Sequence, residues 1–173
     1  MNWYGTVFEV IDMRSFSNLW YWIGLAVMWS SVSHRVLGVP WDLIQRARRH
    51  GEQTHRDVQD LVRVNVNRLI YVADVSGTWA LAIGSAALTA LLILAFWYWV
   101  EFAQALVLLV LPLTVVFVLS LRTARRIAIE GLEAETLYPR LQRLRLMVQG
   151  LGMLSIFVTA MFGMYQNLYT GGF

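Results

Sequence analysis

Four ionisable residues lie beside the long apolar stretches of the sequence: His34, Arg35, Asp74 and Arg122. A charge near the membrane interior is costly unless it is paired or used, so such residues are candidates for ion or proton binding. A carboxylate at the depth of two arginines and a histidine would serve as a proton acceptor or as part of a gated ion site. The simpler interpretation is a structural ion pair whose arginines extend to the lipid headgroups. The sequence therefore predicts a charged cluster at the inner membrane boundary.

A second group of potential ligands comprises His50, Glu52, His55 and Asp57. Metal-binding pairs on a helix usually stand three or four residues apart, and Gly51 interrupts this stretch. We therefore expect a solvated linker and no metal ion. The sequence contains no cysteine, which excludes disulfides, thiolate metal sites, thiolate-ligated iron–sulfur clusters and thiol nucleophiles. No cofactor is expected.

Other catalytic patterns are missing from the sequence. It contains no Gly-rich phosphate loop, no paired catalytic carboxylates and no serine–base arrangement at a workable spacing. The 14 basic residues are all arginine, but acidic residues are interspersed among them, which argues against nucleic-acid binding. We therefore expect a protein that has no catalytic residues and is not an enzyme.

The stretch that organises the chain is the apolar run from Trp79 to Leu121, which only Glu101 and Gln104 interrupt. At about 1.5 Å per helical residue, the run is roughly twice the ~30 Å hydrocarbon thickness of a bilayer. It must therefore fold back as a transmembrane hairpin. The polar pair lies in a cluster of aromatic residues typical of a headgroup belt, so the turn is expected there. Glu101 could line a cation vestibule, although a solvated turn residue is the simpler interpretation.

The whole pattern predicts an all-α integral membrane protein, a single domain over 1–173 with four transmembrane helices in two long hairpins. The four crossings are stretches of about 20 mostly apolar residues, expected at 19–39, 75–99, 102–121 and 147–168. A short interfacial helix is expected at 2–18. Helical cytoplasmic extensions are expected at 40–74 and 122–146, and the second crossing continues the first of them as one long helix. The order of crossing, basic helices and crossing occurs twice, which fits either a structural repeat or ordinary hairpin topology.

The arginines determine the expected orientation of the crossings. All of them except Arg14 lie in the two extensions or at Arg35. Basic residues next to crossings remain on the cytoplasmic side of a membrane, so both extensions are placed in the cytoplasm. We therefore expect a multi-pass protein of the bacterial inner membrane with both termini in the periplasm.

The second extension carries leucines at alternating spacings of four and three residues, and small residues stand on the segment before it. The residues expected to pack against one another are Ala124, Ala128, Gly131, Leu137, Leu141 and Leu144. The third crossing is expected to continue as a helix until Tyr138 and Pro139 interrupt it, because proline cannot continue the hydrogen-bond ladder. The pattern predicts a close-packed helical hairpin outside the membrane, with Glu130, Glu133 and Glu135 available to pair with Arg140, Arg143 and Arg145.

Four segments carry a family resemblance: NWYGTVFEVIDMRSFSNLWYWIGLAVMWS, GVPWDLIQRARRHG, EFAQAL and SLRTARRIAIEGL. They are similar to a family of small alphaproteobacterial membrane proteins catalogued as a "component of SufBCD complex", and the resemblance extends over most of the chain. It implies an accessory membrane partner for an iron–sulfur assembly machine. The segments define no active-site motif, so the resemblance assigns no functional residues.

We expect a non-enzymatic inner-membrane protein that acts through its helix surfaces, as an accessory subunit or a homo-oligomeric scaffold. The alternative is an oligomeric ion channel or small transporter whose path forms between protomers. The expected partners are membrane lipids and either further copies of the chain or the other subunits of a larger membrane complex, with no nucleic acid.

Overall fold

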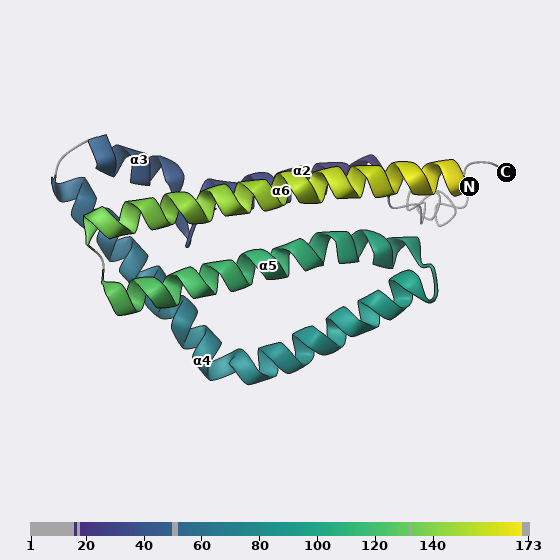
Figure 1. Ribbon diagram of the computed structural model, residues 1–173, viewed down its shortest axis with the longest axis horizontal. Coiled ribbons are helices and arrows are strands. Elements are labelled where there is room, and N and C mark those ends of the chain that lie inside the picture. Colours follow the sequence, from purple (N-terminus) through teal and green to yellow (C-terminus); the bar gives the residue numbers. More distant parts are fainter. Residues whose placement is uncertain (1–15, 17, 50–51, 132, 171–173) are drawn as a thin grey trace, which may run out of the picture.

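The computed structural model of the protein describes residues 16, 18–49, 52–131 and 133–170. The expected interfacial helix at 2–18 therefore lies outside the described residues, apart from Phe16 and Asn18. The described chain is almost entirely helical (Figure 1). Its elements follow in the order α2 (Leu19–His34), β1 (Arg35–Val36), β2 (Val39–Pro40), α3 (Trp41–Arg49), α4 (Glu52–Phe96), α5 (Glu101–Glu130) and α6 (Ala134–Thr170).

Three of the described helices, α4, α5 and α6, are long and apolar enough to cross a membrane. They run as an up-and-down layer with α3 at one end of the molecule (Figure 1). The turn between α4 and α5 and the last residues of α6 lie at the opposite end. We call these the α3 end and the turn end. The prediction of an all-α protein with apolar membrane-length helices is confirmed to this extent.

The turn between α4 and α5 falls where the polar pair interrupts the apolar run. Helix α4 ends at Phe96 and α5 begins at Glu101. The chain reverses direction within four residues, and Trp99 takes a positive φ of 54° there. The predicted hairpin and its turn are therefore confirmed.

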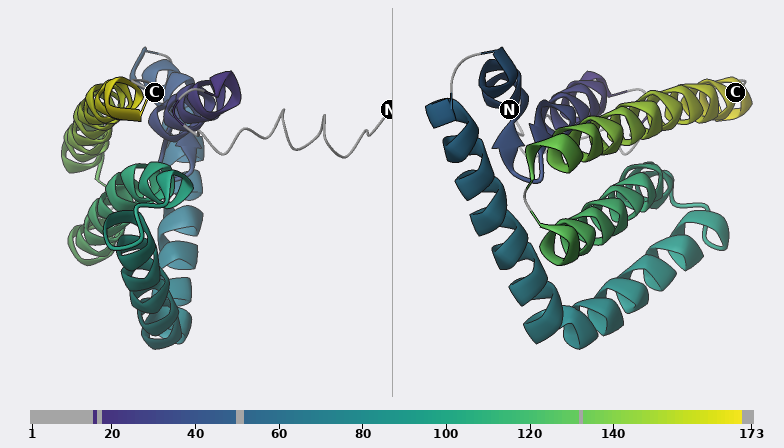
Figure 2. Two further views of the ribbon diagram at one scale, coloured as in Figure 1. Left: turned by 90° about the vertical axis from the view of Figure 1, so that its right-hand side faces the viewer. Right: turned by 60° about the vertical axis from the view of Figure 1, so that its left-hand side comes forward.

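Helix α4 is 45 residues long, so the prediction of one continuous long helix in this part of the chain is confirmed. It bends near its middle, so that its two halves form a wide V (Figure 2). Ser76 and Gly77 stand in this middle stretch, and Gly/Ser pairs are common sites of helix bending. The first half packs with the other helices at the α3 end, whereas the second half diverges from α5 with distance from the turn (Figures 1 and 2).

Helix α2 is shorter than the crossing expected at 19–39. It has 16 residues and ends at His34, where the chain enters a two-residue hairpin turn. Leu37 (φ 50°) and Gly38 (φ 78°) occupy this turn, and positive φ at both central positions is the geometry of the tightest antiparallel hairpins. The two strands were not predicted, because each contains only two residues.

The connection between α5 and α6 also differs from expectation. Helix α5 ends at Glu130, and Gly131 caps it with a φ of 89° and an N–H that donates to the carbonyl of Ile127. Pro139 lies inside α6, near its start, so the prediction that Tyr138 and Pro139 interrupt the helix is wrong. The break occurs at Gly131 because a positive φ costs glycine little. Pro139 lies in the second turn of α6, where it removes one backbone hydrogen bond without ending the helix.

One buried core joins all the helices at the α3 end. It includes side chains of α2, α3, α4, α5 and α6, among them Leu25, Ile44, Val58, Val62, Ala124, Ile127, Leu137, Leu141 and Leu144. The expected burial of the three leucines and of Ala124 is confirmed. Ala128 and Gly131 are exposed, and Ile127 takes their place, so that part of the predicted contact is wrong. Because α3 and α4 also pack on this core, α5 turns a different side inward than a simple two-helix hairpin would.

Candidate functional site

The charged cluster predicted at the membrane boundary is not assembled. Arg125 Nη2 donates to Asp74 Oδ1 at 3.1 Å, so Asp74 pairs with neither Arg35 nor Arg122. His34 Nε2 lies 3.4 Å from the carboxylate of Asp42. Both pairs are mostly exposed, and exposed pairs contribute about 0–1 kcal/mol. The prediction of one four-residue cluster is therefore wrong, although Asp74 does form an ion pair with an arginine of α5.

The choice of Arg125 over Arg122 follows from helix geometry. The two arginines are three residues apart on α5 and lie about one turn from each other. Either could therefore pair with Asp74, depending on where Asp74 lies along the axis of α5. The depth at which the bent α4 presents Asp74 decides between them, and hydropathy alone does not specify that depth.

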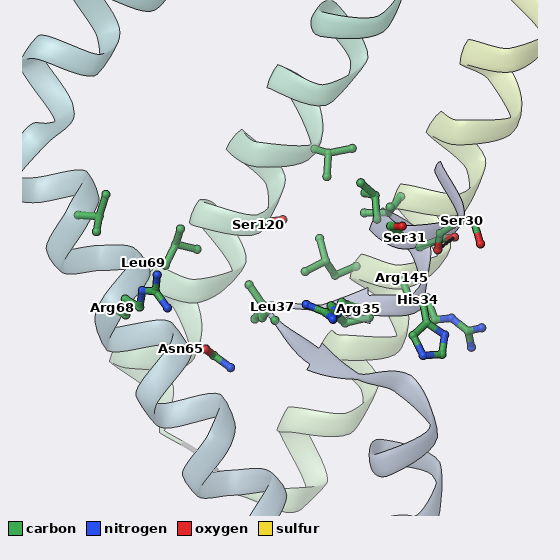
Figure 3. Close-up of a pocket in the computed structure, with 18 residues that line it drawn as sticks. Ser30, Ser31, His34, Arg35, Leu37, Asn65, Arg68, Leu69, Ser120 and Arg145 are labelled. Atoms are coloured by element: carbon green, nitrogen blue, oxygen red, sulfur yellow. Dashed lines mark hydrogen bonds between the residues drawn. The ribbon is translucent and has the colours of Figure 1, made fainter. Parts of the chain in front are cut away.

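A cavity of about 1010 Å³ lies between the helices toward the α3 end (Figure 3). Its walls come from the end of α2 and the hairpin after it, the first half of α4, the middle of α5 and the first half of α6. Arg68 and Asn65 of α4 stand on one side, Ser30 and Ser31 of α2 stand on the other, and the hairpin lies between them (Figure 3). Segments that are distant in sequence therefore build one site, which we call the arginine cavity.

The arginine cavity is strongly basic. Arg35, Arg68 and Arg145 line it, and none of its 18 lining residues is acidic. Within the described part of the chain, the side chains of Arg35 and Arg68 make no ion pair or hydrogen bond. The guanidinium of Arg145 stacks 4.3 Å from the centre of the Trp41 ring, which holds it in place. Its buried Nε has no hydrogen-bond partner among the described residues.

The cavity also has a polarity gradient along the helix axes. On α4, Asn65 and Arg68 precede Val72 in the direction from the α3 end toward the turn end. On α5, which runs the opposite way, Ser120 lies nearer the α3 end than Val116. On α6, Arg145 lies between the apolar Leu144 and Val148. The walls formed by α4 and α5 therefore change from polar to apolar in one direction.

Sequence reasoning identified Arg35 but missed Arg68 and Arg145 as site residues. Arg68 stands before the crossing expected at 75–99 and Arg145 before the one expected at 147–168, so closeness to an apolar stretch was a usable signal. It was not decisive, because basic residues are common on the cytoplasmic side of any membrane crossing.

The region considered for a metal shows a different use of its histidine. His50 lies outside the described residues, and no group of three or more potential ligands occurs among the residues that the structure describes. The Nδ1 atom of His55 is hydrogen-bonded to the Tyr138 hydroxyl at 2.5 Å, and its Nε2 atom lies 3.1 Å from the Gln59 amide. Burial raises the pKa of Tyr138, and the nearby Arg48 opposes this shift. This contact joins α4 to α6 at the α3 end.

The polar pair at the turn end is structural. The amide of Gln104 is fully buried, donates to the carbonyl of Ala95 at 2.9 Å and accepts a hydrogen bond from Gln166. The carboxylate of Glu101 accepts a hydrogen bond from the Phe16 N–H at 2.9 Å. The pair therefore ties α4, α5, α6 and the start of α2 together, rather than leaving Glu101 as a solvated turn residue.

The second half of α4 is the least covered membrane-length segment. Only 6% of its most apolar stretch is buried, against 28% in α5 and in α6. Trp79 and Leu81 are about three-quarters exposed, at 74% and 76%. Gly77 and Gly84 have open space where a side chain would begin. We call this segment the uncovered crossing, after the membrane crossing expected at 75–99.

No protein-family model, no curated protein and no solved structure matches the chain.

Proposed function

We propose that the chain is a non-enzymatic protein of the bacterial inner membrane that crosses the bilayer four times and acts through its helix surfaces. The observation that carries the proposal is the uncovered crossing. A soluble protein would not leave so long an apolar segment exposed, and lipid or another membrane helix is the only favourable neighbour for it.

The fourth crossing in this proposal is α2. It runs antiparallel to α6, because Phe16 lies against Gly163 while Trp29 lies against Gly152. Helix α2 therefore covers the same depth as the apolar part of α6. Its outer side chains, including Leu19, Trp20 and Val27, are exposed and suit lipid. Sixteen helical residues span about 24 Å, so the hairpin after His34 would complete the crossing at the headgroup level.

We further propose that the partner of the uncovered crossing is a second copy of the chain. Gly77, Ala80, Gly84 and Ala87 recur at spacings of three and four residues along the crossing. Small residues at this spacing allow two helix backbones to approach closely, which is the usual basis of helix association in lipid. Such a scaffold would use one face for self-association and leave the α3 end for other proteins.

The test is the oligomeric state of the purified protein in mild detergent, measured by mass photometry and light scattering. Gly84→Leu places a large side chain on the proposed interface, and Gly24→Leu is the matched control. Gly24 also has open space around it but lies on α2. We expect the parent and Gly24→Leu to form the same oligomer and Gly84→Leu to dissociate it. A monomeric parent, or equal behaviour of the two variants, would contradict self-association through α4.

The resemblance to the SufBCD-associated family names one class of further partner. Affinity purification of the tagged protein from its native membrane tests this. Recovery of iron–sulfur assembly proteins with the parent would support the accessory role, and a preparation that contains only the chain itself would favour a scaffold made of copies alone.

A further inference from the structure

We propose that the arginine cavity binds the phosphate headgroup of an anionic amphiphile, whose chains extend toward the turn end along Val72, Val116 and Val148. The inference goes beyond self-association, because the cavity lies within one protomer and its lining residues belong to the α3 end.

The charge of the cavity is the first argument. Arg35, Arg68 and Arg145 line one space, and none of the residues that line it carries a carboxylate. The nearby carboxylate of Asp42 already lies 3.4 Å from His34 and is not part of the lining. The three positive charges therefore favour an anion such as phosphate in this space. Guanidinium groups also match the geometry of phosphate oxygens.

The second argument is a cation held in place. The guanidinium of Arg145 stacks 4.3 Å from the centre of the Trp41 ring, which limits its movement at the wall of the cavity. Asn65 and Ser120 add neutral donors on two other walls.

The polarity gradient argues for an amphiphile over a free anion. On α4 and α5 the polar part of the lining lies toward the α3 end, and the lining becomes apolar toward the turn end. A soluble phosphate would need only the polar part of the lining. A phospholipid at the membrane boundary has the same polarity profile, with its phosphate beside the arginines and its chains beside the valines. The volume of about 1010 Å³ accommodates a headgroup and the first part of the chains.

The experiment measures lipid binding to the detergent-purified full chain by native mass spectrometry, with phosphatidylglycerol, phosphatidylcholine and chain-free glycerol phosphate as probes. Arg68→Gln removes one cavity charge without breaking a described side-chain contact, and Arg35→Gln does the same from the hairpin. Arg46→Gln is the control, because it removes the same charge from α3 outside the cavity. Thermal unfolding establishes that each variant is folded.

We expect phosphatidylglycerol to bind in preference to phosphatidylcholine, and each cavity variant to weaken it by about tenfold, the effect of losing one hydrogen bond between charged groups. Arg46→Gln should bind like the parent. Equal binding of the two lipids, or equal weakening by Arg46→Gln and Arg68→Gln, would overturn the proposal, since general attraction to the basic surface would then suffice. Binding of glycerol phosphate as tightly as phosphatidylglycerol would overturn the amphiphile and assign the cavity to a soluble phosphate.

Discussion

Replacing Leu141 by alanine tests the packing of the α3 end most sharply. Leu141 is fully buried in the same core as Ala124 and Ile127. The substitution removes three carbon atoms, which at about 0.8 kcal/mol each corresponds to a transfer free energy of about 2.4 kcal/mol. The cavity left behind adds a further cost, so the free energy of unfolding should fall by about 2–5 kcal/mol.

Leu146→Ala is the matched control for this prediction. Leu146 lies on the same helix, five residues further along, and is 60% exposed. The same three carbon atoms are removed, but from a surface position, so little change is expected. The two variants and the parent would be compared by thermal and denaturant unfolding in one detergent. If Leu141→Ala unfolds like Leu146→Ala, the packing of α5 and α6 described above is incorrect.

Three further predictions concern other contacts. Gly152→Ala should destabilise the protein in detergent, because the added Cβ would lie 2.8 Å from a tryptophan ring of α2, whereas Gly150→Ala meets open space and should stabilise the helix by up to about 1 kcal/mol. Burial raises the pKa of Tyr138, so the folded state holds this proton more tightly than the unfolded state. Stability should therefore fall as the pH rises above the ordinary tyrosine value of 10.0, and unfolding of Tyr138→Phe as a function of pH should lack this component. Asp74→Asn breaks only an exposed pair with Arg125 and should cost about 1 kcal/mol or less, without ion flux in liposomes of the parent or the variant. Selective flux that the substitution alters would favour the channel.

Hydropathy and local turn chemistry were sufficient to predict the long helices. The length of the run from Trp79 to Leu121 requires a reversal, and Glu101 and Gln104 show where it occurs. The same reasoning could not predict the hairpin after α2. Leu37 has no preference for a positive φ, and it adopts one because Gly38 and the packing of the flanking strands require the turn.

The site was harder to predict than the helices because it depends on helix rotation and bending. The sequence places Arg68, Arg145 and Arg35 in three separate segments, and their convergence follows from how α4, α6 and the hairpin pack. The bend of α4 likewise places Asp74 beside Arg125. Neither the direction of a side chain around a long helix nor the position of a bend follows from hydropathy.

The proposal that the chain crosses the membrane four times, with the α3 end in the cytoplasm, is tested most directly by labelling single cysteines. Because the chain has no cysteine, single cysteines can be placed without background labelling. Leu19→Cys and Tyr98→Cys lie toward the turn end, and Asp42→Cys and Thr136→Cys lie toward the α3 end. In spheroplasts, an impermeant maleimide should label the first two, and it should label the last two only after the inner membrane is permeabilised. Labelling of Asp42→Cys or Thr136→Cys in sealed spheroplasts would contradict the account.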